Sequence, residues 1–113
     1  MEQEYKKWLS QFRKGYIELY TLLALENGNC LHGSALLSLF EKNDLKINEG
    51  TLYPLLNRME QNEWLDSAWN IPKTNGHPKR EYSISNKGKE ILPLLLEAYT
   101  LHNESINKIK DLK

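Results

Sequence analysis

Apolar residues recur every three or four positions in the first half of the chain, which is the spacing of one face of a helix. Residues 8–26 form the longest such run, and an Asn-Gly-Asn sequence ends it. A second run spans residues 32–43. A third follows Asn48, whose side-chain oxygen suits a helix start because it can accept a hydrogen bond from an unpaired amide of the first turn. Three short helices in succession predict a helix-turn-helix.

The pattern then changes to strict alternation. Residues 64–69 and 80–84 alternate apolar and polar side chains, and a segment rich in Asn, Pro, Gly and Lys joins them, so we expect a β-hairpin with a flexible tip. Ser85 can cap a final helix. Apolar positions on that helix alternate spacings of three and four, which is typical of a coiled-coil-like contact: Leu92, Leu95, Tyr99, His102, Ile106 and Ile109.

This order of elements is that of a winged helix. We therefore expect a mainly α fold with a small β-hairpin, in which a winged helix-turn-helix is followed by a long C-terminal dimerisation helix. Residues 1–85 would form the winged-helix domain, including the N-terminal helix, and residues 86–113 the dimerisation helix, together one structural unit. With 113 residues, 40% of them apolar, the chain can build one modest core. Too little of it remains to cover the last helix, so we expect a homodimer whose interface contains the six positions above.

The charge of the chain limits how it can bind nucleic acid. Fifteen basic and fifteen acidic residues cancel, so contact with DNA must come from local clustering of cations. The longest apolar stretches fall short of the roughly 18 residues that a membrane span needs, and the amino terminus has no signal-like apolar core. We therefore expect a soluble, cytoplasmic protein without a membrane partner. Cys30 is the only cysteine and cannot form an internal disulfide.

The third helix, residues 48–62, has one apolar and one polar face. A step of 100° per residue places its leucines and Met59 on the apolar face. Arg can pair with guanine and Asn with adenine, while hydroxyls and amides hold phosphates, so the polar face suits a recognition helix. An ordinary amphipathic helix with a solvated face would show the same pattern. The candidate DNA contacts on this helix are Asn48, Thr51, Tyr53, Asn57 and Arg58.

The hairpin tip, residues 70–80, is locally basic although the chain is neutral. It contains Lys73, His77, Lys79 and Arg80 and no acidic residue. A cationic hairpin tip can reach phosphate or a minor groove, whereas a solvated turn also carries scattered cations. The combination of this tip with a preceding polar helix face favours DNA binding more than either feature alone.

Six motifs lie in order over about residues 13–90. They are Arg13-Lys14-Gly15, His32-Gly33, the run from Gly50 to Glu60 (Gly-Thr-Leu-Tyr-Pro-Leu-Leu-Asn-Arg-Met-Glu), Trp69, Gly76-His77-Pro78-Lys79-Arg80, and the run from Tyr82 to Gly88. In this order they resemble the PadR family of winged-helix transcriptional regulators, in particular its smaller members with a single short terminal helix. Ser34, His77 and Glu81 depart from the family pattern, so the resemblance fixes neither the affinity of the wing nor the operator sequence.

The resemblance implies a dimeric transcriptional repressor. It would bind a palindromic double-stranded DNA operator through recognition helix 48–62 and wing 70–80, and a small planar aromatic effector would release it. Flat side chains in a dimer groove can stack a flat ligand, but they can equally pack an interface. The candidate effector residues are Trp8, Phe12, Tyr99 and His102.

Three other classes of protein were weighed. A winged-helix dimer that serves as a protein–protein interaction module without DNA binding fits the zero net charge, but the cations of residues 73–80 argue against it. A metal site is not expected, because Cys30, His32, His77 and His102 lack compact ligand spacing. An enzyme or a cofactor is not expected either, because no nucleophile with a nearby base and no phosphate-binding glycine loop is present.

Overall fold

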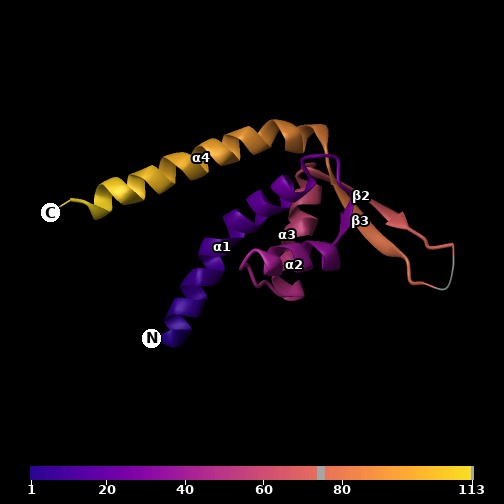
Figure 1. Cartoon of the computed structure of the whole chain (residues 1–113), viewed down its shortest axis with the longest axis horizontal. Coiled ribbons are helices and arrows are strands. Elements are labelled where there is room, and N and C mark those ends of the chain that lie inside the picture. Colours follow the sequence, from indigo (N-terminus) through magenta and orange to yellow (C-terminus); the bar gives the residue numbers. More distant parts are fainter. Residues whose placement is uncertain (74–75, 113) are drawn as a thin grey trace.

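A computed structural model describes residues 1–73 and 76–112. It has the winged-helix arrangement that the sequence predicts, with α4 running away from the body on one side and a hairpin projecting on the other (Figure 1). In chain order the elements are α1 (Glu2–Leu25), β1 (Leu31–His32), α2 (Gly33–Lys42), α3 (Glu49–Gln61), β2 (Leu65–Asn70), β3 (Lys79–Ile84) and α4 (Asn86–Lys110).

The first helix begins earlier than its apolar pattern predicted. α1 starts at Glu2 rather than near Trp8, and its first turn contains Glu2 and Glu4. Acidic side chains are favourable there because the unpaired amides give a helix N-terminus partial positive charge. A Lys6–Glu2 pair of 3.5 Å spans one turn. Apart from Tyr5, which stacks on Trp8, residues 2–7 are polar and exposed, so apolar periodicity gave too weak a signal for the start.

Side-chain caps fix the starts of the other three helices. The Oδ1 of Asn48 accepts a hydrogen bond of 2.9 Å from the backbone amide of Thr51, three residues later in the chain. Asn48 is therefore confirmed as the cap of α3. The Oγ of Ser85 does the same for α4 at 3.0 Å, also as predicted. At α2 the cap is His32, whose Nδ1 accepts from the Ala35 amide at 3.2 Å.

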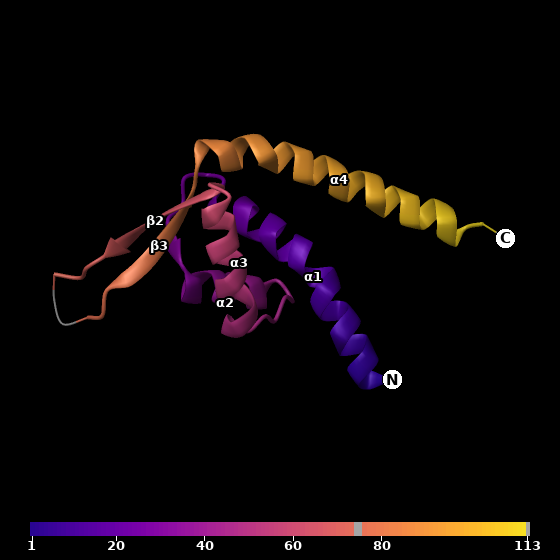
Figure 2. The same ribbon diagram turned by 180° about the vertical axis from the view of Figure 1, so that it is seen from behind.

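The small sheet has a strand that the sequence did not predict. Its order is β1-β3-β2, all antiparallel, so β3 lies between its neighbours. β1 pairs Leu31 with Tyr82 and His32 with Glu81. A two-residue strand is too short to show alternation, which explains why it was missed. The two longer strands form the hairpin that projects beyond α2 and α3 in the view from behind (Figure 2).

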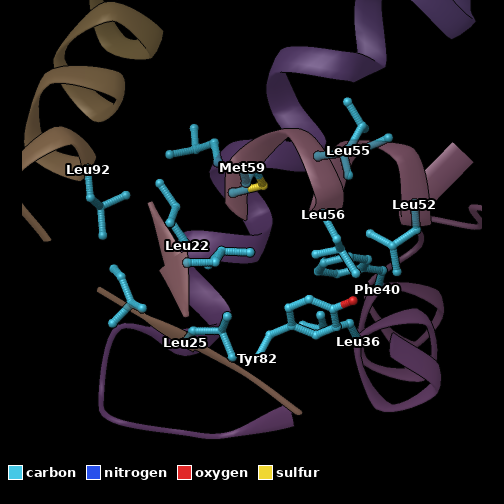
Figure 3. Packing of buried hydrophobic residues seen from close by; sticks show 14 residues of the cluster. Leu22, Leu25, Leu36, Phe40, Leu52, Leu55, Leu56, Met59, Tyr82 and Leu92 are labelled. Atoms are coloured by element: carbon cyan, nitrogen blue, oxygen red, sulfur yellow. The ribbon is translucent and has the colours of Figure 1, made fainter. Parts of the chain in front are cut away.

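One apolar core joins all four helices to the sheet. Figure 3 shows side chains of this cluster, from helices and from β3, pointing toward one another. The predicted apolar face of α3 is fully part of it. Leu92 of α4 is also part of it and only 1% exposed, so the prediction that Leu92 lies at a dimer interface is wrong. The first turns of α4 therefore belong to the winged-helix body.

Candidate nucleic-acid interface

The polar face of α3 lies between α1 and the hairpin. On the hairpin side, Tyr53 and Asn57 line a groove of about 370 Å³. On the other side, Thr51 and Arg58 line a groove of about 320 Å³ shared with α1. The structure therefore divides the predicted recognition residues into two groups, with Asn48 at the exposed helix start.

Arg58 is tied to the first helix. Its Nη2 donates to Oε1 of Glu18 at 2.7 Å, and the Glu18 side chain is only 12% exposed. The Arg58 side chain is 51% exposed, so other donors of the guanidinium still face solvent. Arg58 thus links α3 to α1 in addition to its predicted role in DNA contact. Glu18 was not singled out in the sequence, because no local pattern marks a partner 40 positions away.

The packing of Tyr53 accounts for the glycine of the His-Gly motif at the start of α2. Its ring end lies directly over Gly33, where a Cβ would collide with the Tyr53 hydroxyl. His32 meanwhile caps the helix. The two residues of the motif therefore have separate roles, because His32 caps α2 and Gly33 leaves room for Tyr53 of α3.

The groove between α3 and the hairpin combines aromatic and cationic chemistry. Among the described residues that line it there is no carboxylate, so it suits a sugar-phosphate backbone better than a cation. Burial raises the pKa of the Tyr82 hydroxyl above its ordinary value of 10.0, so this phenol stays neutral at physiological pH. The lining consists of His32, Gly33, Ser34, Tyr53, Asn57, Trp69, Pro78, Lys79, Arg80 and Tyr82.

The strand register assigns the wing residues to two faces. Trp69 pairs with Arg80 and Asn70 with Lys79, and paired residues of antiparallel strands point to the same face. Successive pairs alternate, so Arg80 and Lys79 point to opposite faces. The predicted cations Lys73, His77 and Lys79 are all exposed. Residues 74 and 75 of the predicted wing lie outside the described residues.

Arg80 differs from the other predicted wing cations because two nitrogens of its guanidinium, Nε and Nη2, donate within the chain. Its Nη2 donates to both carboxylate oxygens of Glu60, at 2.8 and 2.7 Å, and its Nε donates to the Ser67 hydroxyl at 3.0 Å. The guanidinium also lies 5.6 Å from the centre of the Tyr82 ring. Neither Glu60 nor Ser67 was expected from the sequence to take part in the site.

The predicted effector residues gather between α1 and α4. A groove of about 370 Å³ there is lined mainly by apolar side chains, including Phe12, Tyr99 and His102. Trp8 lies outside this lining but stacks on Phe12, with ring centres 5.0 Å apart. Tyr16, which was not among the predicted effector residues, meets Tyr99 edge-on at 5.8 Å and joins the two helices. Its spacing of four from Phe12 was the available signal.

Comparison with known proteins identifies the family. A model described as "Transcriptional regulator PadR-like family" matches residues 12–93. The chain belongs to the PadR-like family. The resemblance seen in the motifs is therefore confirmed, and the PadR-like family is one of transcriptional regulators rather than enzymes. No curated protein sequence matches the chain.

Solved structures of transcriptional regulators, two of them described as PadR proteins, share the fold. A PadR-like transcription factor from Bacteroides fragilis is 32% identical, with 91% of this chain and 98% of that one covered and a TM-score of 0.75. A PadR family regulator from Eggerthella lenta is 20% identical, with coverage of 99% and 96% and a TM-score of 0.85. A transcriptional regulator from Clostridium thermocellum is 25% identical, with coverage of 87% and 96% and a TM-score of 0.76.

The helices that the structure describes include none with the length and apolarity to cross a bilayer. Within residues 1–73 and 76–112, His, Cys, Asp and Glu side chains form no group of three that could hold a metal ion.

Proposed function

We propose that this PadR-like protein is a dimeric repressor that binds a palindromic DNA operator. The observation that carries the proposal is the position of the aromatic and cationic groove between the polar face of α3 and the hairpin. A recognition helix in the major groove, flanked by a wing on the backbone or minor groove, needs such a continuous surface. Tyr53 and Asn57 would face the DNA from α3, and Lys73, His77 and Lys79 from the wing.

Dimerisation is supported by apolar side chains that the chain leaves exposed. On α4, Ile106 is 58% and Ile109 68% exposed, and Tyr99 is also exposed. On α1, Trp8 and Phe12 are exposed on the same aromatic row. Together these positions are more than the scattered single apolar residues of an ordinary surface. A second copy that pairs α1 and α4 would cover them and would give the twofold symmetry that a palindrome requires.

An aromatic effector would fit the groove between α1 and α4. Its volume of about 370 Å³ lies within the range of small-molecule sites, and its rings can stack a flat ligand. α1 carries Phe12 at this groove and Glu18 at the pair with Arg58 of α3. A ligand that shifts α1 would therefore act on the recognition helix, provided it binds the DNA-free and DNA-bound states with different affinity.

The test is binding to a duplex selected from random sequence, measured by fluorescence anisotropy between low and moderate salt. A DNA reader with several phosphate contacts loses affinity steeply as salt rises. The protein should bind the selected duplex tightly and with such a slope. If no duplex is selected and binding at low salt is negligible, the protein is instead a winged-helix module for protein–protein interaction.

A further inference from the structure

Three side chains from three elements close a ring of hydrogen bonds at the base of the hairpin. Arg80 of β3 donates to Glu60 of α3 and to Ser67 of β2. The ring is completed by Ser67, whose hydroxyl donates to the Glu60 Oε2 at 2.7 Å. We call this set, Glu60, Ser67 and Arg80, the clamp. It joins the recognition helix directly to both strands of the wing.

The guanidinium of Arg80 is held at two of its nitrogens. Its Nη2 donates to both carboxylate oxygens of Glu60 and its Nε donates to the Ser67 hydroxyl, so two different partners restrain the plane of the group, which a single ammonium nitrogen could not achieve. The Arg80 and Glu60 side chains are 38% and 27% exposed, so water screens them less than it screens the surface pair of Lys6 and Glu2. The clamp is thus a specific link rather than one of many surface ion pairs.

The clamp lies where the third strand stops supporting the hairpin. β1 pairs with β3 only at Tyr82 and Glu81, so the sheet is two-stranded from Arg80 outward. A two-stranded ribbon without further packing is marginally stable and bends easily. The clamp acts at the Trp69–Arg80 pair, and the exposed Lys79 follows one residue pair farther out.

We infer that the clamp positions the wing relative to the recognition helix, and that Arg80 acts through this geometry instead of contacting phosphate. Simultaneous contact of α3 and the wing tip with one operator requires a fixed separation between them. A supporting set of side chains that holds the contacting ones in place is how a site gains selectivity. The inference rests on the proposed DNA-binding function, which it deepens by giving Arg80, Glu60 and Ser67 a positioning role.

The test measures three clamp variants, which are Arg80→Gln, Glu60→Gln and the two changes combined. The control is Lys79→Gln, which removes a neighbouring exposed cation. Affinity is measured for the selected operator and for a random duplex over a range of salt concentrations. Each clamp variant should lower the ratio of operator to random affinity by about tenfold, the effect of losing a charged hydrogen bond, and leave the salt slope unchanged. The double variant should be no worse than the worse single one. Lys79→Gln should weaken both duplexes alike and reduce the salt slope by about one.

Other results would overturn the inference. A phosphate-binding Arg80 predicts that Arg80→Gln reduces the salt slope by about one and that Glu60→Gln strengthens binding by freeing the cation. Independent effects that multiply in the double variant would also contradict a clamp. Circular dichroism checks that each variant folds, and Ser67→Ala supplies a milder change that should act in the same direction. If the unmodified protein binds no DNA, the proposed function fails; if it binds and the clamp variants bind identically, only the clamp fails.

Discussion

The winged-helix body and the two helical arms differ in how far their apolar side chains are exposed. In the body, Leu22, Leu56 and Leu92 are almost fully buried within their own chain. In the arms, which are residues 2–15 of α1 and 97–110 of α4, residues such as Trp8 and Ile106 remain mostly exposed. The body is therefore stabilised by contacts that one chain supplies, whereas the arms have apolar surface that only another molecule can cover. This difference separates the part that we propose reads DNA from the part that we propose holds two copies together.

The largest expected effect is in the body. Leu56→Ala removes a fully buried side chain of α3 and should lower the free energy of unfolding by about 2–5 kcal/mol, through lost burial and the cavity left behind. Urea denaturation measures it. The matched control is Leu101→Ala in the arm, where the side chain is exposed and the loss should be far smaller in dilute protein. Equal losses in both variants would remove the distinction between body and arms.

In the arms, truncation of an apolar side chain should weaken the association of two chains rather than the folding of each chain. Ile106→Ala should weaken the dimer by about 2 kcal/mol, because it truncates an apolar residue at the proposed interface. Analytical ultracentrifugation of the variant and of the neighbouring Glu104→Ala control measures the dissociation constant. Monomeric behaviour of the unmodified protein at micromolar concentration would contradict the proposed role of the arms.

Within the body, the first turn of α4 is packed against the backbone of a neighbouring segment. A Cβ at Gly88 of α4 would collide with the carbonyl oxygen of Trp64 and would press on the Ile84 side chain. Gly88→Ala should therefore destabilise the fold by about 1–3 kcal/mol, although alanine is the better helix former. Thermal unfolding followed by circular dichroism tests this. A gain in stability would show that α4 docks less tightly than the structure indicates.

The smallest effect is at the cap of the same helix. Ser85→Ala removes an oxygen that accepts from the Gly88 amide and should cost about 1 kcal/mol of stability. Replacement by Thr, whose hydroxyl can accept from the Gly88 amide and also donate to the Glu63 carbonyl oxygen as Ser85 does, should restore most of it. Urea denaturation of both variants makes the comparison, and an unchanged midpoint for Ser85→Ala would mean that the cap contributes nothing measurable.

The sequence predicted elements whose signals are local. The apolar periodicity of α3 lies within the helix itself, and the caps Asn48 and Ser85 directly precede the helices that they start. The structure confirms these predictions. The strand β1 was missed because two residues show no period. The partners of Arg58 and Arg80 could not be predicted, because Glu18 and Glu60 lie 40 and 20 positions away and only the fold brings them together.

Leu92 is a second case in which the sequence pattern did not predict a tertiary contact. Its spacing fits the apolar seam of α4, but the first turns of this helix pack against the winged-helix body of the same chain. Only the part of the seam that follows Leu92 can therefore lie at an interface. The pattern of apolar positions gives the face of a helix but not which neighbour covers it. The proposed interface residues that stay at the surface or partly buried are Leu95, Tyr99, His102, Ile106 and Ile109.

The most direct test of the account is the mass of the complex with a selected palindromic duplex in sedimentation equilibrium. Two protein chains should bind each duplex, because the arms would join two bodies that each read one half-site. Replacing Ile106 by Asp should abolish this two-chain complex while leaving a folded body. A complex with a single chain per duplex in the unmodified protein would contradict the central claim, as would two chains that still bind together after Ile106→Asp.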